Sequence, residues 1–250
     1  MKILLTNDDG IYADGLWALF DRLSAKHRVT VIAPDRERSA VGHGITLHDP
    51  IRAQLVTVNG GGRGLAVNGT PADCVKLAIL EILDHRPDLV VSGINPGANV
   101  GVHLNYSGTV SAAKEAALYG IAAIAVSIQG RRSNHYADAS AFIERLADRV
   151  FHYGLPTGTF LNVNVPDIPL ADTAGVRVSR QATSMLSDYF EKRIDPRDQT
   201  YYWQGIDTQS GFDQPDTDGA VLRKKHISVT PIKCDMTDYA LMDDLEKWEL

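Results

Sequence analysis

The stretch that decides the fold is ILLTNDDG, residues 3–10, in which a short apolar run ends at two adjacent carboxylates. On a continuing strand, Asp8 and Asp9 would point to opposite faces, but Gly10 can adopt the backbone angles that curl the chain and let both side chains face one point. Converging carboxylates repel each other unless a positive charge lies between them, and hard divalent cations prefer oxygen ligands. Asn, Asp and Gly are also the commonest turn residues, so the motif by itself fits either a metal site or a plain turn.

The segments around this turn predict an α/β fold with parallel strands. Residues 3–6 and 29–33 are typical of buried strands, and residues 15–25 between them carry apolar side chains at helical spacing. Such a βαβ unit has a right-handed crossover, which makes its two strands parallel. Ligands bind beyond the carboxyl ends of strands in open α/β sheets, so the position of the turn favours a functional role. We expect further strands or extended pieces at residues 45–47, 55–58, 64–67, 88–93, 121–127, 160–165, 176–178 and 227–232. We expect helices starting near residues 70, 107, 136 and 217 and an amphipathic tail at 239–248.

Composition excludes several classes of protein. The 250 residues are 44% hydrophobic, which is enough for one substantial core, and the formal net charge of -6 offers no basic field for a nucleic-acid duplex. Neither GxGxxG nor GK[ST] follows the first strand, which disfavours a nicotinamide dehydrogenase and a P-loop. The longest apolar runs are too short to cross a bilayer and no secretory leader is recognisable, so we expect a cytoplasmic protein without a membrane partner.

Three further loops leave the same predicted edge of the sheet. Ser39 lies in the loop after the second strand, where spacing alone favours a solvated connection over a cation ligand. Asn95 opens a long polar loop and offers a neutral oxygen, while Gly97 permits close approach of the backbone. The helix start at residues 107–109, Ser-Gly-Thr, could hold a phosphate at its free N–H groups, or Ser107 could simply be an N-cap.

The chain changes character after residue 182. Residues 188–191 and 200–203 are aromatic-rich and predict a hairpin that projects from the core. Such an arm is typical of a surface for a second copy of the chain, although it could pack back on its own domain. We therefore expect a catalytic core at residues 1–182 and, at residues 183–250, an extension of hairpin arm, returning strand and tail helix that is used in oligomerisation.

Taken together, five segments resemble the SurE family, the survival-protein nucleotidases. They are residues 3–11, 33–39, 68–73, 92–99 and 106–110, with the late strand at residues 229–231 in addition. The resemblance implies a Rossmann-like three-layer core and a projecting arm used in homodimer or homotetramer assembly. It also implies metal-dependent hydrolysis of nucleoside monophosphates to nucleoside and phosphate, and leaves 3′-nucleotides and polyphosphate open as further substrates.

The resemblance also assigns residues. By position in the motifs, Asp8, Asp9, Ser39 and Asn95 match the family's metal ligands, which changes the interpretation of Ser39. They imply one divalent cation per subunit, Mg²⁺ or Mn²⁺, at a site that Ca²⁺ can also occupy. Residues that resemble the phosphate surroundings are Asn95, Gly97, Ser107, Gly108 and Thr109.

Two catalytic routes and one non-catalytic reading follow from these residues. In the first route the cation and water act together, and Asp8 or Asp9 orients or deprotonates the water. In the second, Asp8 attacks phosphorus and forms an aspartyl phosphate. From a different class, the chain could be a nucleotide- or divalent-metal-binding module that performs no catalysis.

Overall fold

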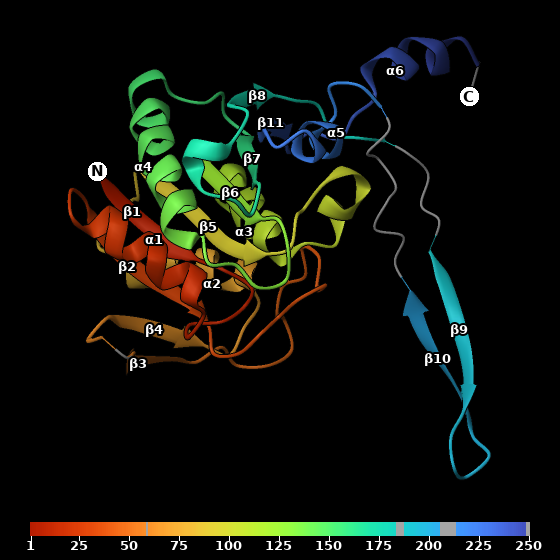
Figure 1. Ribbon diagram of the computed structural model, residues 1–250, viewed down its shortest axis with the longest axis horizontal. Helices are drawn as coiled ribbons and strands as arrows, with labels where there is room; N and C mark the ends of the chain where they lie inside the picture. Colours follow the sequence, from red (N-terminus) through yellow and green to blue (C-terminus); the bar gives the residue numbers. More distant parts are fainter. Residues whose placement is uncertain (59, 184–187, 206–213, 249–250) are drawn as a thin grey trace.

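Nine strands form a mostly parallel sheet with helices on both faces, and a two-stranded hairpin projects from it (Figure 1). The computed structural model describes residues 1–58, 60–183, 188–205 and 214–248. The strand order is β3-β4-β2-β1-β5-β6-β7-β11-β8, with antiparallel pairs at β3/β4 and β7/β11 and parallel pairs elsewhere in the sheet. This confirms the expected α/β fold.

The strands of this sheet follow the apolar runs of the sequence closely. Their bounds are β1 Lys2–Thr6, β2 Arg28–Pro34, β3 Ala53–Thr57, β4 Arg63–Val67, β5 Leu89–Pro96, β6 Ala123–Ile128, β7 Thr159–Val165, β8 Val176–Val178 and β11 Ile227–Lys233. In β1, Ile3 and Leu5 face one hydrophobic cluster and Leu4 faces the other. Burial on both faces explains why the central strands β1, β5 and β6 carry continuous apolar runs instead of alternating patterns, whereas the edge strands β3 and β8 are largely exposed.

Two helical layers cover the sheet. The helices of the core are α1 Asp14–Ser24, α2 Pro71–Leu77, α3 Gly108–Leu118, α4 Tyr136–Tyr153 and α5 Asp218–Arg223, and a further helix, α6 Tyr239–Leu245, lies outside these layers. Buried residues of α1 and α4 belong to one cluster, and those of α2 and α3 to the other. No helix in the described part of the chain is long and apolar enough to cross a membrane.

The structure corrects the expected strand at residues 45–47. These residues lie in the loop between β2 and β3, which has no helix or strand. The reason is local, because the backbone N–H of Thr46 donates to the Asp73 carboxylate at 3.0 Å instead of to a neighbouring strand. The helix that begins at Pro71 also changes form, since residues Ala78–Ile82 continue it as a π-helical turn.

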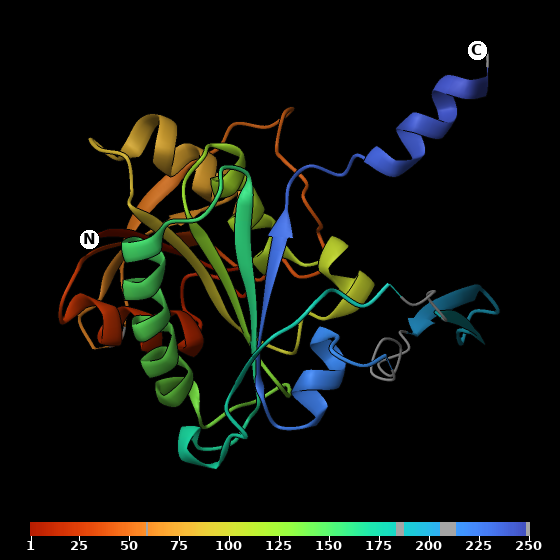
Figure 2. The same cartoon turned by 90° about the horizontal axis from the view of Figure 1, so that it is seen from above.

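The hairpin arm consists of β9 Tyr189–Ile194 and β10 Thr200–Gly205, which pair with each other as a separate sheet. All side chains of β9 are exposed, and in β10 only Gly205 is partly buried. Figure 2 shows the arm and α6 both extending outward from the core. Between the arm and α6 the chain contributes β11 to the core sheet, where this strand lies between β7 and β8.

Candidate active site

The turn after β1 is held by Asn7 and shaped by Gly10. The Asn7 side chain donates from Nδ2 to the Gly10 carbonyl at 3.0 Å and accepts at Oδ1 from the Gly10 N–H at 3.2 Å. Gly10 has φ +100°, and a Cβ at this position would lie 3.0 Å from the carbonyl carbon of Arg36. Glycine is therefore needed for the backbone angle and for the close packing of this turn on the loop after β2.

Asp8 links this turn to two other segments. Its carboxylate accepts a hydrogen bond from the Thr109 hydroxyl, and its carbonyl accepts from the Arg38 N–H at 2.7 Å. A Cβ on Gly108 would lie 2.7 Å from the Asp8 Cβ, so helix α3 can approach Asp8 this closely only with glycine there. Asp8 itself is 4% exposed. The structure thus brings Asp8, Gly108 and Thr109 into direct contact.

Asp9 is a partly buried acid beside other acids. Its Oδ2 atom is buried and has no hydrogen-bond partner among the described residues. Burial, followed by the negative charges of Asp8 and Glu37, raises the pKa of Asp9 to about 7. Burial likewise raises the pKa of Asp8, although its hydrogen bonds with Thr109 oppose the shift. In this structure the acids share a site that disfavours their negative charge.

Two residues of this site escaped the sequence analysis. Glu37 raises the pKa of both aspartates, which places its carboxylate near them. Tyr136, at the first position of α4, has a pKa raised by burial and then by Asp9. Tyr136 belongs to no recognisable motif, and Glu37 lies within the segment of residues 33–39 without an assigned role, so only the meeting of distant segments at the sheet edge brings both to Asp9.

Ser39 and Asn95 come from the two neighbouring strand ends. The Ser39 side chain is exposed and its hydroxyl donates to Glu37 Oε1 at 2.7 Å, one residue after the Arg38 contact with Asp8. Asn95 lies near the end of β5, which pairs with β1 as far as Thr6 and Ser92. Within the described residues no hydrogen bond joins either side chain to Asp8 or Asp9.

Gly97 holds the Asn95 amide in place. Asn95 Nδ2 donates to the Gly97 carbonyl at 2.6 Å, which leaves Oδ1 as the atom that could bind a cation. The N–H of Gly97 itself donates to the Ile128 carbonyl at 2.9 Å. Because that donor is occupied, a direct phosphate contact through the Gly97 N–H would require breaking a bond of the sheet edge.

Most polar groups at the start of α3 already have hydrogen-bond partners within the protein. Ser107 is the N-cap, and its hydroxyl accepts from the Val110 N–H at 3.2 Å, so the capping alternative holds. The Thr109 hydroxyl and backbone N–H both interact with the Asp8 carboxylate. A carboxylate at this end of the helix is favoured by the helix dipole. A phosphate at the same place would share the helix start with Asp8.

The donor set fits a hard cation. In the described ranges, no group of three or more His, Cys, Asp and Glu side chains is placed to hold a metal ion. A cation at this edge would therefore combine two carboxylates with neutral oxygens, as the Ser39 hydroxyl and the Asn95 amide can provide. The unpartnered oxygen of Asp9 is the atom that such an ion would satisfy.

A cavity of about 350 Å³ lies between α3 and β11. It is lined by His43, Leu104, Asn105, Val110, Ser111, Lys114, Phe160, Gln181, Pro231, Ile232, Lys233, Asp235 and Met236. None of the four candidate cation ligands lines it, so the cavity is distinct from the site at Asp8 and Asp9.

Comparison with known proteins gives one consistent result. A family model described as "Survival protein SurE" matches residues 3–188. A "5′-nucleotidase SurE" from Desulfatibacillum aliphaticivorans is 57% identical over 250 residues, covering 100% of this chain and 99% of that protein. One from Syntrophobacter fumaroxidans is 49% identical over 250 residues, covering 100% of both chains. The crystal structure of the SurE protein from Aquifex aeolicus superposes with a TM-score of 0.86 at 35% identity, covering 100% of both chains.

Proposed function

The chain belongs to the SurE family, and we propose that it hydrolyses nucleoside monophosphates with one divalent cation held at Asp8 and Asp9. Full-length relatives at 57% and 49% identity carry the name 5′-nucleotidase, so this protein is a 5′-nucleotidase, a phosphomonoesterase. The cation and the roles of individual residues are the part that we propose.

The observation that supports a cation most directly is the buried Oδ2 of Asp9, which lacks a hydrogen-bond partner among the described residues. An unpaired buried carboxylate costs several kcal/mol in desolvation. Asp8 and Glu37 lie nearby with the same charge, so nothing in this acidic group offsets that cost. Asp8, Asp9, the Ser39 hydroxyl and the Asn95 Oδ1 would hold the ion, and Mg²⁺ or Mn²⁺ suits such oxygen ligands, with Ca²⁺ as a further occupant.

The reaction follows from what these residues can do. When bound, a divalent cation supplies positive charge that polarises a phosphate oxygen and favours attack by water. Thr109 fixes the orientation of Asp8 through its hydroxyl, and the Asp9 carboxylate oxygen that does not bind the ion can orient the attacking water and accept its proton. The Gly108 N–H, at the first position of α3, would bind an equatorial phosphate oxygen. Gly97 acts by orienting Asn95.

The test is release of inorganic phosphate from a panel of 5′- and 3′-nucleoside monophosphates and polyphosphate. Treatment with a chelator should abolish release from 5′-nucleotides, and added Mg²⁺ or Mn²⁺ should restore it. Full activity in the chelator would reject the cation. Rapid acid quenching with AMP radiolabelled at phosphorus separates the two routes, since a trapped phosphoryl-enzyme would support attack by Asp8 and its absence during turnover would support attack by water.

We propose further that residues 183–250 mediate assembly on the catalytic core of residues 1–182. The exposed side chains of the arm include Phe190, Tyr202 and Trp203, which are 67%, 59% and 60% exposed. Large aromatic side chains on a two-stranded hairpin gain stability only when another surface covers them. Light scattering of the intact protein should give a dimer or tetramer, and replacing residues 189–205 with a short glycine-rich link should lower the mass towards that of the monomer.

A further inference from the structure

The loop that carries Ser39 has few internal means of holding its shape. Residues 35–52 join β2 to β3 without a helix or strand. Ala40 has φ 56°, a left-handed conformation that costs a non-glycine residue about 1 kcal/mol or more. The position of such a loop is therefore set by its contacts with the elements around it.

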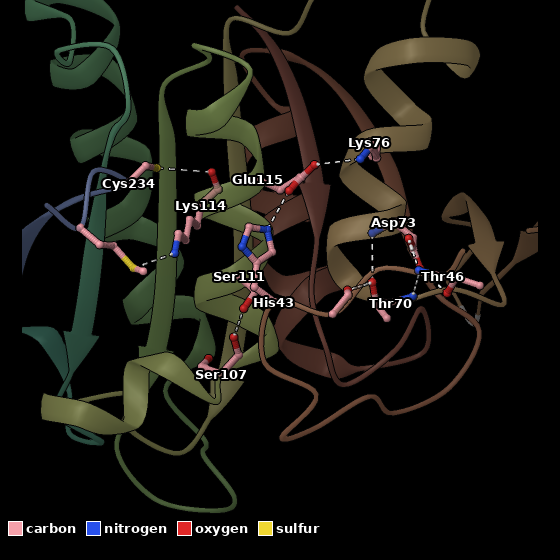
Figure 3. Close-up of polar contacts among 12 residues, drawn as sticks. His43, Thr46, Thr70, Asp73, Lys76, Ser107, Ser111, Lys114, Glu115 and Cys234 are labelled. Carbon is pink, nitrogen blue, oxygen red and sulfur yellow. Dashed lines mark hydrogen bonds and ion pairs between the residues drawn. The ribbon is translucent and has the colours of Figure 1, made fainter. Parts of the chain in front are cut away.

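One contact is made by a buried carboxylate of helix α3. Glu115 Oε2 lies 2.7 Å from His43 Nε2, and Glu115 Oε1 lies 3.9 Å from Lys76 Nζ on α2. The Glu115 side chain is only 7% exposed. Figure 3 shows His43 reaching from the loop towards Glu115, with Lys76 on the other side of the carboxylate.

A second contact is made by the start of helix α2. Asp73 accepts hydrogen bonds from the Thr46 N–H at 3.0 Å and from the Thr46 hydroxyl at 2.6 Å, while the Thr70 hydroxyl donates to the Gly44 carbonyl at 2.8 Å (Figure 3). Asp73 also closes the capping box of α2 with Thr70. Its presence is thus explained by the helix as well as by the loop.

Two backbone bonds complete the attachment on either side of Ser39. Arg38 donates to the Asp8 carbonyl at 2.7 Å, and Gly42 donates to the Tyr106 carbonyl at 3.0 Å. His43 follows directly after the second of these bonds. The pair of His43 and Glu115 therefore fixes the loop four residues beyond Ser39, at the point where it crosses α3.

Glu115 has no comparable role within its own helix. It lies in the second half of α3, where the helix dipole disfavours negative charge, and burial disfavours the charge further. The two basic partners of its carboxylate, His43 and Lys76, both lie outside α3. An alanine would suit this alanine-rich helix better, so the carboxylate is explained by its contact with the loop.

We propose that Glu115 is a positioning residue for the cation site, acting through His43 on the loop that carries Ser39. It touches neither the cation nor the substrate, and it raises the affinity for the cation by holding the Ser39 hydroxyl in reach of Asp8 and Asp9. The inference rests on the proposed function, because Ser39 is a proposed ligand.

The experiment measures Mn²⁺ binding to the full-length, metal-free protein by electron paramagnetic resonance. Glu115→Ala and His43→Ala should each raise the Kd for Mn²⁺ about tenfold, as loss of a residue that orients a ligand does. At saturating Mn²⁺, kcat should stay within about twofold of the wild type. The double variant should bind Mn²⁺ no more weakly than the weaker single variant, because the two side chains act as one unit. His43→Gln should restore most of the affinity, since its amide nitrogen can replace Nε2.

Glu144→Ala is the matched control. Glu144 is also a buried helical glutamate with two basic partners, Arg22 and Lys26, but it lies on α4, on the other face of the sheet. Its replacement should cost stability and leave the Kd for Mn²⁺ unchanged. A second readout is hydrogen exchange of residues 36–46 in the metal-free protein, which should become faster in His43→Ala and Glu115→Ala and stay unchanged in Glu144→Ala.

The outcomes separate this inference from the proposed function. Wild-type affinity for Mn²⁺ in both His43→Ala and Glu115→Ala would overturn the inference while leaving the cation site intact, and so would an equal loss in Glu144→Ala. A wild-type protein that turns over AMP in chelator would overturn the proposed function and this inference with it. The His43 side chain is 25% exposed, so His43→Ala provides the test even where Glu115→Ala fails to fold.

Discussion

Gly108→Ala tests whether the approach of α3 to Asp8 governs activity. The added Cβ would lie 2.7 Å from the Asp8 Cβ and 3.0 Å from its Oδ2. Carbon atoms pack best at roughly 3.5–4.0 Å, so Asp8 and the helix start must separate by about 0.8 Å or more. A displacement near 1 Å at a reacting group can cost on the order of 100-fold in rate. We therefore expect kcat/KM to fall by one to two orders of magnitude, although alanine itself favours helix by up to about 1 kcal/mol.

The assay is phosphate release from AMP at saturating Mn²⁺, with the Kd for Mn²⁺ and the thermal midpoint measured in parallel. Gly175→Ala is the control, because Gly175 has φ +100° with no atom within 4 Å of an added Cβ, so alanine introduces backbone strain there without a clash. It should lower the midpoint and leave kcat/KM unchanged. If Gly108→Ala kept wild-type activity and Mn²⁺ affinity, the contact between α3 and Asp8 would have no part in the chemistry.

Further predictions concern the acids. Asp8→Asn should abolish turnover with the fold retained, because an amide oxygen can still accept the Thr109 bond; activity and circular dichroism together check this. Asp9→Asn should also lower kcat strongly, and wild-type kcat at saturating metal would contradict the role of Asp9. In the metal-free protein the pKa of Asp9 is about 7, against 3.8 in the unfolded chain. Between pH 3.8 and about 7 the folded state therefore binds more protons than the unfolded state, and the free energy of unfolding should fall as pH rises through this range. Mn²⁺ should then raise the thermal midpoint more at pH 8 than at pH 5, and equal shifts would count against the site. Lys26 and Arg22 hold the pKa of Glu144 below its usual 4.5. The ion pairs of Glu144 therefore stabilise the fold fully above pH 4.5, and this stabilisation is lost as pH falls through the lowered pKa. Urea unfolding should show Glu144→Gln costing roughly 1–2 kcal/mol at pH 7 and less at pH 3.

Most of the sheet could be predicted because its strands are buried on both faces. The strands β1, β5 and β6 each contain a run of three or four consecutive apolar residues, and glycine and proline residues lie near their ends. The Thr70 cap of α2 and the Ser107 cap of α3 are hydrogen bonds within four residues of the chain, so the local sequence is enough to predict them. The wrong strand at residues 45–47 has the opposite origin, since Thr46 binds Asp73, 27 residues later.

The candidate site likewise contains residues that local sequence indicates and residues that only contacts between distant segments bring together. Asp8 and Asp9 stand in a motif that by itself fitted a metal site or a plain turn and gained its assignment from the family resemblance, whereas Glu37 and Tyr136 meet them only in three dimensions. The sequence also indicated a free phosphate cradle at the start of α3. In the structure Thr109 binds Asp8 there, because helix packing places a carboxylate at that end. Which donors are already occupied depends on tertiary contacts, and no spacing rule conveys it.

The two aspartates are chemically unequal, and this difference bears on the mechanism. Asp8 is fixed through its carboxylate by Thr109 and through its carbonyl by Arg38, and burial raises its pKa although the Thr109 contact opposes the shift. A nucleophile must approach phosphorus along one line, and a carboxylate already bound to a hydroxyl would have to give up that bond or attack with its other oxygen. Asp9 has a buried oxygen with no partner among the described residues, and its pKa of about 7 in the metal-free protein means that protons compete with a cation for this carboxylate. The Thr109 bond therefore counts against an aspartyl phosphate, and we propose attack by water, with Asp9 as the side chain that receives the proton and Asp8 as the one that fixes the site to α3.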